Sequence, residues 1–331
     1  MSEFSSEKSK SPWHAGELAM QQTTGVAEAM TEVGRQVIRE YMPDRHREFF
    51  EQLPLVFVGT VDHAQQPWAT VVTGTPGFAR SPDTRTLELY SPLDSADPAS
   101  AGVWTGGSVG LLGIDLSSRR RNRMNGIVVR ADCDGFSVAV QQSFGNCPSY
   151  IQRRSLEVSS APRRTSEAQR SVGGKLDQRA REMVEKADTL FIATYADVEG
   201  NYQVDIGHRG GRTGFVRIDE DGTLTFPDFA GNSFFNTLGN ILLSGKAGLL
   251  FADFANGDLL QITGSAAIVF DSPEVAAFEG AERIVRCMPQ EVVFRPGALA
   301  LRWKDDPDGL SVNTEMTGDW ATASARLKER A

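Results

Sequence analysis

The sequence predicts a mainly β fold with flanking helices, an α+β class, arranged as two related units in tandem. Short apolar runs rich in Val, Ile, Leu, Phe and Thr alternate with turn-forming segments such as residues 62–67 (DHAQQP) and 219–222 (DEDG). Several of these runs recur in the same order in the second half of the chain. Helical patterns flank the apolar runs and separate the two sets.

Composition limits the classes of protein to consider. The chain has 331 residues, of which 40% are apolar and 23% charged, which is enough for two domains with buried cores. A net charge of -9 argues against broad nucleic-acid binding. No apolar run approaches the roughly 18 residues of a membrane span, and the N-terminus has no apolar signal core, so we expect a cytoplasmic protein without membrane contact. Three scattered cysteines predict no disulfide framework and no metal site.

Four pairs of matching runs make up the internal repeat. They are residues 55–62 (LVFVGTVD) with 190–197 (LFIATYAD), 76–80 (PGFAR) with 213–217 (TGFVR), 86–89 (TLEL) with 223–226 (TLTF), and 110–116 (GLLGIDL) with 248–254 (GLLFADF). Their separation is nearly constant, as expected for two copies of one unit that differ by small loop insertions. Each copy has the short antiparallel strands of a small barrel or sandwich.

The repeat sets the domain boundaries. We expect a helical segment over residues 1–46, the first unit over 47–152, a polar linker over 153–174, and the second unit with extra helices over 175–331.

Three segments have helical patterns. Residues 15–40 carry apolar side chains at near-helical spacing and predict a helix before the first unit. Residues 175–187 predict a helix that leads into the second unit. Residues 273–285, with Pro at their start, predict a third helix.

Polar segments that one copy has and the other lacks are candidates for function, because both copies must keep the apolar frame. The second copy alone has HRGGR at 208–212, whose cations and glycines suit a phosphate, and FPDFAGNSFFNTLGN at 226–240, which offers Asn and Ser donors. The first copy alone has RRRNRMNG at 119–126, and QQSFGNCPSYIQ at 141–152 after a strand over 136–140. The competing interpretations are a solvated hairpin turn, a helix cap and plain turns.

Together these segments predict a composite binding site between the two units. An alternating strand sends the arginines of 119–126 to opposite faces, so only some of them can face a ligand. No side chain stands out as an essential acid or base, and no catalytic residue is predicted. The predicted binding residues are His208, Arg209, Gly210, Gly211, Arg212, Asp228, Asn232, Ser233 and Asn236 of the second copy, and Arg121, Arg123, Gln142, Ser143 and Asn146 of the first copy.

These long blocks, with SPWHAGELAMQ and REYMPDRHREFFEQLP before them, resemble the pyridoxamine 5'-phosphate oxidase-like, FMN-binding split-barrel family, in particular a bacterial branch with two tandem units. The resemblance covers most of the chain. It implies six-stranded barrel-like units that hold FMN at their interface. By position, it implies a basic strand at His208 and Arg209 and a phosphate-binding turn at Asn232, Ser233 and Asn236. It further implies that Gln142 and Ser143 reach in from the other unit.

Two departures from the family pattern bear on the substrate. The turn reads AGNSFFN where the parent oxidases have Ser-Arg-Lys, and the C-terminal Trp and Arg of the pyridoxine-phosphate pocket have no clear counterpart. We therefore do not expect oxidation of pyridoxamine phosphate itself.

The resemblance implies an FMN-dependent oxidoreductase, a flavoprotein acting on an unidentified small molecule. The sequence has no G-x-G-x-x-G motif, so electrons would come from a reduced nicotinamide donor or a separate reductase. Family habit favours a homodimer. One alternative is a haem-binding or haem-degrading protein; of the available His14, His46, His63 and His208, axial ligation would need His208 or a residue of the surface near the linker. Another is a flavin carrier or sensor without enzymatic activity.

Overall fold

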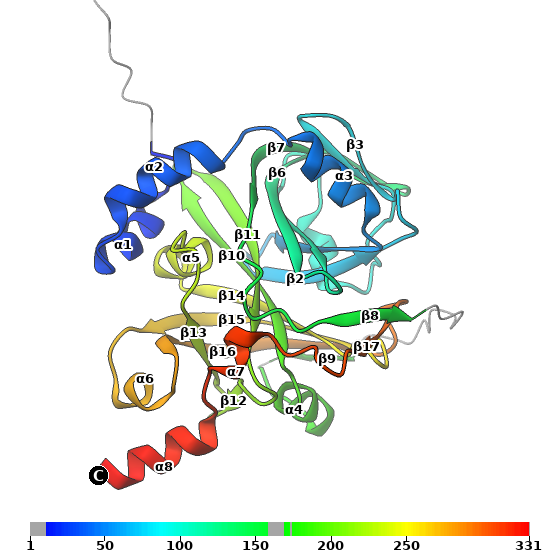
Figure 1. The fold of residues 1–331 in the computed structure, drawn as a ribbon. Helices are drawn as coiled ribbons and strands as arrows, with labels where there is room; N and C mark the ends of the chain where they lie inside the picture. Colours follow the sequence, from blue (N-terminus) through cyan, green and yellow to red (C-terminus); the bar gives the residue numbers. More distant parts are fainter. Residues whose placement is uncertain (1–10, 158–168, 173, 331) are drawn as a thin grey trace, which may run out of the picture.

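The computed structural model describes residues 11–157, 169–172 and 174–330 (Figure 1). Two large antiparallel sheets contain most of the strands, and helices lie around them, which confirms the prediction of a mainly β chain with flanking helices. No helix in the described ranges is long and apolar enough to cross a membrane.

The first sheet has seven strands in the order β2-β1-β5-β6-β7-β4-β3. It is preceded by three helices, and a short 3-10 helix interrupts it. The bounds are α1 (Ala15–Thr23), α2 (Ala27–Val37), α3 (Asp44–Gln52), β1 (Leu55–Val61), β2 (Pro67–Thr73), β3 (Ala79–Asp83), β4 (Thr86–Leu89), η1 (Pro98–Gly102), β5 (Ser108–Asp115), β6 (Arg120–Asp132) and β7 (Gly135–Gly145).

The second sheet has the order β11-β10-β14-β15-β16-β13-β12, with β9 added beside β16. Each strand from β10 to β16 therefore occupies the place of a strand from β1 to β7. The bounds are β9 (Gln169–Val172), α4 (Gln178–Glu185), β10 (Thr189–Val198), β11 (Asn201–Gly210), β12 (Arg217–Ile218), β13 (Leu224–Phe229), α5 (Asn236–Ser244), β14 (Lys246–Ala252), β15 (Leu259–Val269), α6 (Pro273–Ala277) and β16 (Ala281–Arg295).

Each sheet curls around its own apolar core. Residues from all seven strands of the first sheet, among them Val58 and Leu111, belong to one buried cluster, and residues such as Ile192 and Leu249 belong to the cluster of the second sheet. A third cluster lies between the two sheets. It takes the alternate side chains of β1 and β10, which explains why β1 is buried along its whole length.

The two sheets approach each other closely at two glycines in corresponding strands. A Cβ at Gly110 of β5 would lie 2.9 Å from the Cα of Asp205 in β11, and a Cβ at Gly248 of β14 would meet the Pro67 carbonyl at the start of β2. Because β11 corresponds to β2 and β14 to β5, the two contacts are equivalent: in each, the β5-type strand of one sheet meets the β2-type strand of the other. The predicted repeats at 110–116 and 248–254 thus lie at the interface between the sheets.

One of the predicted repeat matches differs by one residue from the equivalence that the structure gives. The sequence match aligns Leu55 with Leu190. The strand pairing places Phe57 opposite Leu112 and Phe191 opposite Leu250, so that Phe57 and Phe191 are equivalent. The displacement matters because neighbouring residues of a strand point to opposite faces of the sheet.

The helix predictions need two corrections. Residues 15–40 form two helices, α1 and α2, because Gly25 between them has a φ of 72°. Residues 273–285 are not one helix. The α6 helix starts at Pro273 and ends at Ala277, and strand β16 begins at Ala281 after Gly280, whose φ is 82°. The side chains of β16 alternate in burial from Val285 to Gln290, and the β-branched residues near the start of the strand favour this extended structure. The helix predicted over 175–187 appears as α4.

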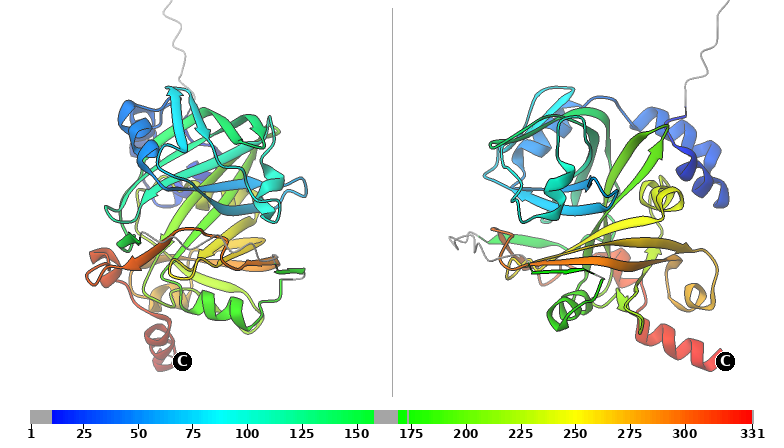
Figure 2. Two further views of the ribbon diagram at one scale, coloured as in Figure 1. Left: turned by 90° about the vertical axis from the view of Figure 1, so that its right-hand side faces the viewer. Right: turned by 180° about the vertical axis from the view of Figure 1, so that it is seen from behind.

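The predicted linker contributes strands of its own. Strand β8 (Arg154–Glu157) pairs with β17 (Arg302–Asp305), and β9 pairs with β16. Residues 158–168 and 173 of that linker lie outside the described residues. Two helices follow β17, α7 (Val312–Glu315) and α8 (Trp320–Arg330), and α8 packs against α6 at the far end of the second sheet (Figure 2).

Candidate functional site

Most of the predicted binding residues line a single pocket between the two sheets. The first sheet contributes the start of β6 and the segment after β7. The second contributes the end of β11, strand β13, the turn before α5 and the first turn of α5. The predicted residues in this pocket are Arg121, Arg123, Asn146, His208, Arg209, Gly210, Asp228, Asn232, Ser233 and Asn236.

Strand alternation divides the arginines of β6. Arg121 and Arg123 line the pocket. Met124, the next residue after Arg123, points to the opposite face of the strand and into the core of the first sheet. Arg120 stacks over the Phe49 ring with its Cζ 4.4 Å from the centroid. Two of the clustered arginines therefore reach the pocket because they share one face of the strand.

Arg123 joins the two sheets at the floor of the pocket. Its side chain is buried, and one guanidinium nitrogen donates to the Asp205 carboxylate at 2.9 Å and to the Asn236 Oδ1 at 3.0 Å. A Cβ at position 207 would lie 2.9 Å from this guanidinium group, so Gly207 leaves the space that Arg123 occupies. The position of Arg123 is thus fixed from both sheets.

Two basic residues at the end of β11 differ in environment. His208 is 3% exposed, and its Nε2 has no hydrogen-bond partner among the described residues. Burial lowers the pKa of His208 well below its usual value, and the nearby Arg121 and Arg209 lower it further, so the ring is neutral. Arg209 is partly exposed and lies 3.4 Å from the Asp228 carboxylate.

The second sheet adds an arginine that sequence reasoning missed. Arg283 of β16 is buried and donates from Nε to Asp228 at 3.1 Å. It also pairs with Glu282 and lies over the Phe235 ring, with its Cζ 5.0 Å from the centroid. The segment around it had been predicted as helix, which concealed that Arg283 faces the same pocket as Arg209.

The turn before α5 has unusual backbone geometry. Ser233 and Phe235 both have a φ of 60°, in the left-handed region that residues with a side chain rarely occupy. Such strain is often found at binding sites, where surrounding structure maintains it. Here the turn places Asn236, Thr237 and Leu238, the first residues of α5, on the pocket wall. Backbone N–H groups in the first turn of a helix have no partner within the helix and favour an anion.

Aromatic rings form another wall of the pocket. Tyr150 stacks on Phe229 with ring centroids 5.1 Å apart and ring planes 27° apart, and Phe235 lies beside Arg283. Tyr150 also has a positive φ, of 63°. Tyr150 lies within residues 141–152, the segment that the first copy has and the second copy lacks, but it is not among the predicted site residues.

Charge in the pocket is unbalanced in favour of cations. Arg121, Arg123, Arg209 and Arg283 line it, against the carboxylates of Asp228 and Glu282. Arg121 donates from Nε to the Cys147 carbonyl at 2.6 Å and forms no ion pair with a carboxylate in the described part of the chain. Burial and the neighbouring Arg123 and Arg209 lower the pKa of Arg121. A buried cation without a carboxylate partner, close to other cations, favours an anionic ligand.

Four predicted residues lie outside this pocket. Gln142 lies in a separate hollow beside Asn125 and the tip of the β10–β11 hairpin. Ser143 is fully buried, and its Oγ is 2.9 Å from the His46 Nδ1. The prediction placed both after the end of a strand at residue 140. Strand β7 instead continues to Gly145, so these side chains follow the alternation of the sheet.

Gly211 and Arg212 have structural contacts instead. Gly211 packs against Phe215, and a Cβ there would lie 2.6 Å from the Cβ of that residue. Arg212 donates to the carbonyl oxygens of Glu315 and Thr317. It thereby holds the segment around α7 against the second sheet.

No group of His, Cys, Asp and Glu side chains within the described ranges is placed to hold a metal ion. The chemistry of the pocket is that of an anion site with an aromatic wall.

No known protein-family model matches this chain, and no curated protein matches it. Among solved structures, HupZ from Group A Streptococcus is 18% identical over 35% of this chain and 90% of its own, with a TM-score of 0.29. HutZ from Vibrio cholerae, described as a heme storage protein, is 13% identical over 37% of this chain and 95% of its own, with a TM-score of 0.27. An FMN-binding protein from Syntrophomonas wolfei is 16% identical over 34% of this chain and 86% of its own, with a TM-score of 0.24.

Proposed function

We propose that the pocket between the two sheets binds FMN and that the chain is an FMN-dependent oxidoreductase. The observation that carries the proposal is the convergence of four arginines with the first turn of α5 beside an aromatic wall. Phosphate is recognised by arginine and by helix N-termini, and a flavin ring packs well on aromatic side chains. The sequence resemblance to FMN-binding split barrels supports the same ligand.

Buried polar atoms without partners support such a ligand. His208 Nε2, Arg123 Nε and Asn146 Oδ1 are buried without a hydrogen bond among the described residues. A buried polar group usually has a partner, because leaving it unpaired costs about 1–3 kcal/mol. All three residues line this pocket, and the oxygens and ring nitrogens of FMN could supply partners for them.

The roles we assign to the chain are binding roles. Arg121, Arg209 and the first turn of α5 hold the phosphate, Arg123 supports them from the floor, and Tyr150 and Phe229 pack against apolar ligand surface. The bound group would supply hydride and one-electron transfer. The small-molecule substrate and the source of electrons, a reduced nicotinamide or a separate reductase, stay open, and we assign no acid or base.

We infer further that the two sheets are copies of one split-barrel unit. Their identical strand order and the reciprocal contacts of Gly110 and Gly248 support this inference. The boundaries 47–152 and 175–331 then separate the two copies, and the pocket lies between them. Pairing of two chains into a homodimer and a cytoplasmic location stay predictions.

The proposal is tested with the purified full chain and FMN. We expect a visible flavin spectrum after equilibration with FMN and removal of the excess, with FMN identified by mass after release. Arg209→Ala should weaken FMN binding about tenfold to a hundredfold, which is the loss of one charge-assisted contact. Arg130→Ala is the matched control, because Arg130 pairs with Asp132 away from the pocket. A protein that stays colourless at high FMN concentration would contradict the proposal.

One observation supports haem as a second candidate ligand. Among the four histidines, His208 lines this pocket with a buried and unpartnered Nε2, whereas His46 is bonded to Ser143 and His14 caps α1. A neutral imidazole with a free nitrogen is the usual axial ligand of haem. A Soret band that His208→Ala abolishes, in a protein that does not retain FMN, would favour haem over flavin.

A further inference from the structure

We propose that Glu17, in the helix before the first unit, is a positioning residue whose protonation state controls how tightly the pocket holds its anionic ligand. This proposal rests on the proposed function, namely that the pocket takes a phosphate-bearing ligand such as FMN.

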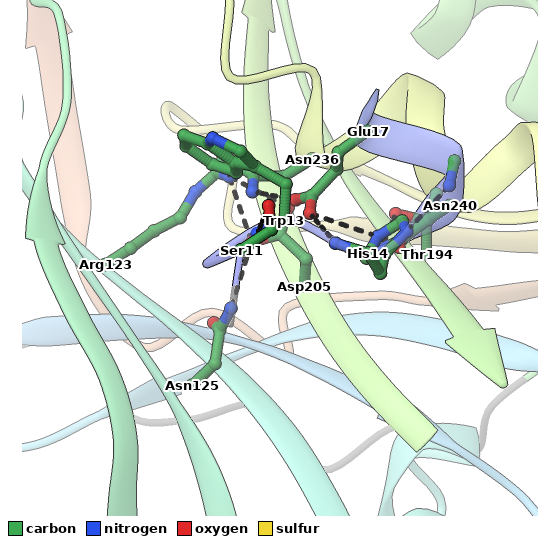
Figure 3. Close-up of polar contacts among 11 residues, drawn as sticks. Ser11, Trp13, His14, Glu17, Arg123, Asn125, Thr194, Asp205, Asn236 and Asn240 are labelled. Atoms are coloured by element: carbon green, nitrogen blue, oxygen red, sulfur yellow. Dashed lines mark hydrogen bonds and ion pairs between the residues drawn. The ribbon is translucent and has the colours of Figure 1, made fainter. Parts of the chain in front are cut away.

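A continuous chain of polar contacts connects Glu17 to the pocket (Figure 3). The Asn236 Nδ2 donates to the Glu17 Oε1, and the Asn236 Oδ1 accepts from Arg123 at 3.0 Å. Arg123 in turn donates to Asp205 at 2.9 Å. Asn236 and Arg123 both line the pocket, whereas Glu17 does not line it and bonds to Asn236. Glu17 therefore fixes which end of the Asn236 amide faces Arg123.

Glu17 is buried because α1 packs very closely on α5. A Cβ at Gly16 would clash with the carbonyl of Gly239, and a Cβ at Gly239 would lie 2.6 Å from the backbone nitrogen of Glu17. Two glycines thus let the helix backbones touch. Glu17 is 5% exposed as a result. This close packing brings the Glu17 carboxyl to the first residue of α5.

Glu17 also forms a capping box, but that role does not explain its second contact. The His14 backbone N–H donates to the Glu17 Oε2 at 3.0 Å, which completes the cap of α1. A capping glutamate needs only this bond and usually stays in water. Here the other carboxyl oxygen bonds to a pocket residue, so the cap is connected to the ligand site.

Three charged or titratable groups face Glu17. They are His14 on its own helix, Arg123 on β6 and Asp205 on β11, and the side chains that face it from α5 are neutral. Burial raises the pKa of Glu17 to about 8. The bonds from His14 and Asn236 lower this pKa, Asp205 raises it, and Arg123 lowers it. Burial lowers the pKa of His14, so its ring is neutral near pH 7.

The balance of charge around Arg123 explains the coupling to the ligand. With Glu17 protonated, one carboxylate, Asp205, neutralises Arg123. When Glu17 ionises, a second buried carboxylate, separated from Arg123 by the Asn236 amide, adds its negative charge near the guanidinium group at the floor of the pocket. The added negative charge disfavours a bound phosphate. By the reciprocity of linkage, a bound phosphate must favour the protonated form of Glu17.

The first test measures the dissociation constant of FMN as a function of pH for the full chain, Glu17→Gln and Glu28→Gln. Wild-type binding should weaken on the order of tenfold from about pH 7 to about pH 9, an effect of roughly 1.4 kcal/mol. Glu17→Gln keeps the shape of the side chain and should lose this slope. Glu28→Gln, at an exposed position of α2, should keep it. An unchanged slope in Glu17→Gln would overturn the proposal.

The second test needs no variant and stands if Glu17→Gln does not fold. Calorimetry in buffers of different ionisation enthalpy measures the protons taken up when FMN binds. At about pH 8, where the FMN phosphate is already a dianion, we expect net proton uptake by the wild-type protein. FMN binding without proton uptake would overturn this proposal alone. An absence of FMN binding at every pH would overturn the proposed function as well.

Discussion

Phe57 of the first sheet and Phe191 of the second lie face to face between the sheets, with ring centroids 3.5 Å apart and ring planes 14° apart. Strand pairing makes the two residues equivalent, because Phe57 is opposite Leu112 and Phe191 is opposite Leu250. Contact between equivalent residues is the mark of a two-fold axis. The two sheets thus meet about a pseudo-two-fold axis, and the pocket that Arg121 and Arg209 line must have a counterpart position on the other side of the axis.

The counterpart position is filled. Gln261 is opposite Leu250 as Arg123 is opposite Leu112, so Gln261 takes the place of Arg123. Its Nε2 donates to the Asp97 Oδ1 at 2.8 Å and to the Ala69 carbonyl at 3.0 Å. Arg295 pairs with Asp97 at 2.7 Å, and Asp97 is 2% exposed. A carboxylate of the chain itself thus occupies this side of the axis, where the short η1 stands in place of α5.

We predict from this asymmetry that each chain binds one FMN. Equilibrium dialysis with a large excess of FMN should reach a plateau at one ligand per chain, because Asp97 already neutralises the cation on the filled side. A plateau at two would mean that the Asp97 side opens, and it would contradict the prediction.

The pair of Arg295 and Asp97 should be important for stability. Arg295→Met leaves the Asp97 carboxylate buried without its cation, which should cost about 3–5 kcal/mol in the free energy of unfolding. Arg286→Met on the same strand is the matched control. Arg286 pairs with Glu274 at the surface, and such pairs contribute about 0–1 kcal/mol. Urea unfolding of both variants measures the difference, and equal losses would contradict the assignment of the filled side as core.

Cys147 offers an independent test of where the ligand binds. It lines the pocket with its Sγ 2.8 Å from the Ser149 Oγ, whereas Cys133 is exposed and lies outside the pocket. Bound FMN should slow the alkylation of Cys147 and leave that of Cys133 unchanged, because a ligand in the pocket excludes the reagent. Mass spectrometry of digested protein measures both rates. Equal rates at Cys147 with and without saturating FMN would place the ligand elsewhere.

Local differences between the copies predict one part of the candidate site. Arg209 and Asn232 are predicted because the first copy has nothing like them at the matching positions, and both line the pocket. The prediction that Gln142 and Ser143 face the pocket was wrong. The sequence pattern did not reveal that β7 continues past Val140, where it stays paired with β6 up to Gly145. Arg283 was missed because residues 273–285 were predicted as one helix, whereas α6 ends at Ala277 and Arg283 lies in β16, which begins at Ala281.

The rest of the site depends on contacts between segments far apart in the sequence, which no local pattern reveals. The sequence around Asp205 has no feature that marks a binding site. Its contact with Arg123 exists only because the two sheets pack together. Glu17 precedes the first unit entirely, and it reaches Asn236 only because two glycines let α1 touch α5. The fold class followed from composition and repeats, whereas the residues behind the pocket wall required the three-dimensional arrangement.

The buried Glu17 should also leave a signature in the stability of the protein without ligand. Burial raises its pKa from 4.5 to about 8 in the folded chain. Below about pH 4.5 both states keep the proton, and the contribution is complete. From there to about pH 8 only the unfolded state releases the proton, so the free energy of unfolding falls by about 1.4 kcal/mol per pH unit for this group. Above about pH 8 the contribution is lost and the slope ends.

Comparison with Glu17→Gln isolates this contribution, because the amide cannot ionise. His14 contributes with the opposite sign, since burial lowers its pKa and its stabilising effect is lost as the pH falls below about 6.5, but the variant retains His14. Urea unfolding at several pH values should therefore show the wild-type protein losing stability relative to Glu17→Gln as the pH rises from about 5 to about 8. Parallel curves for the two proteins would show that Glu17 is ionised in the folded state and would remove the basis for its coupling to the ligand.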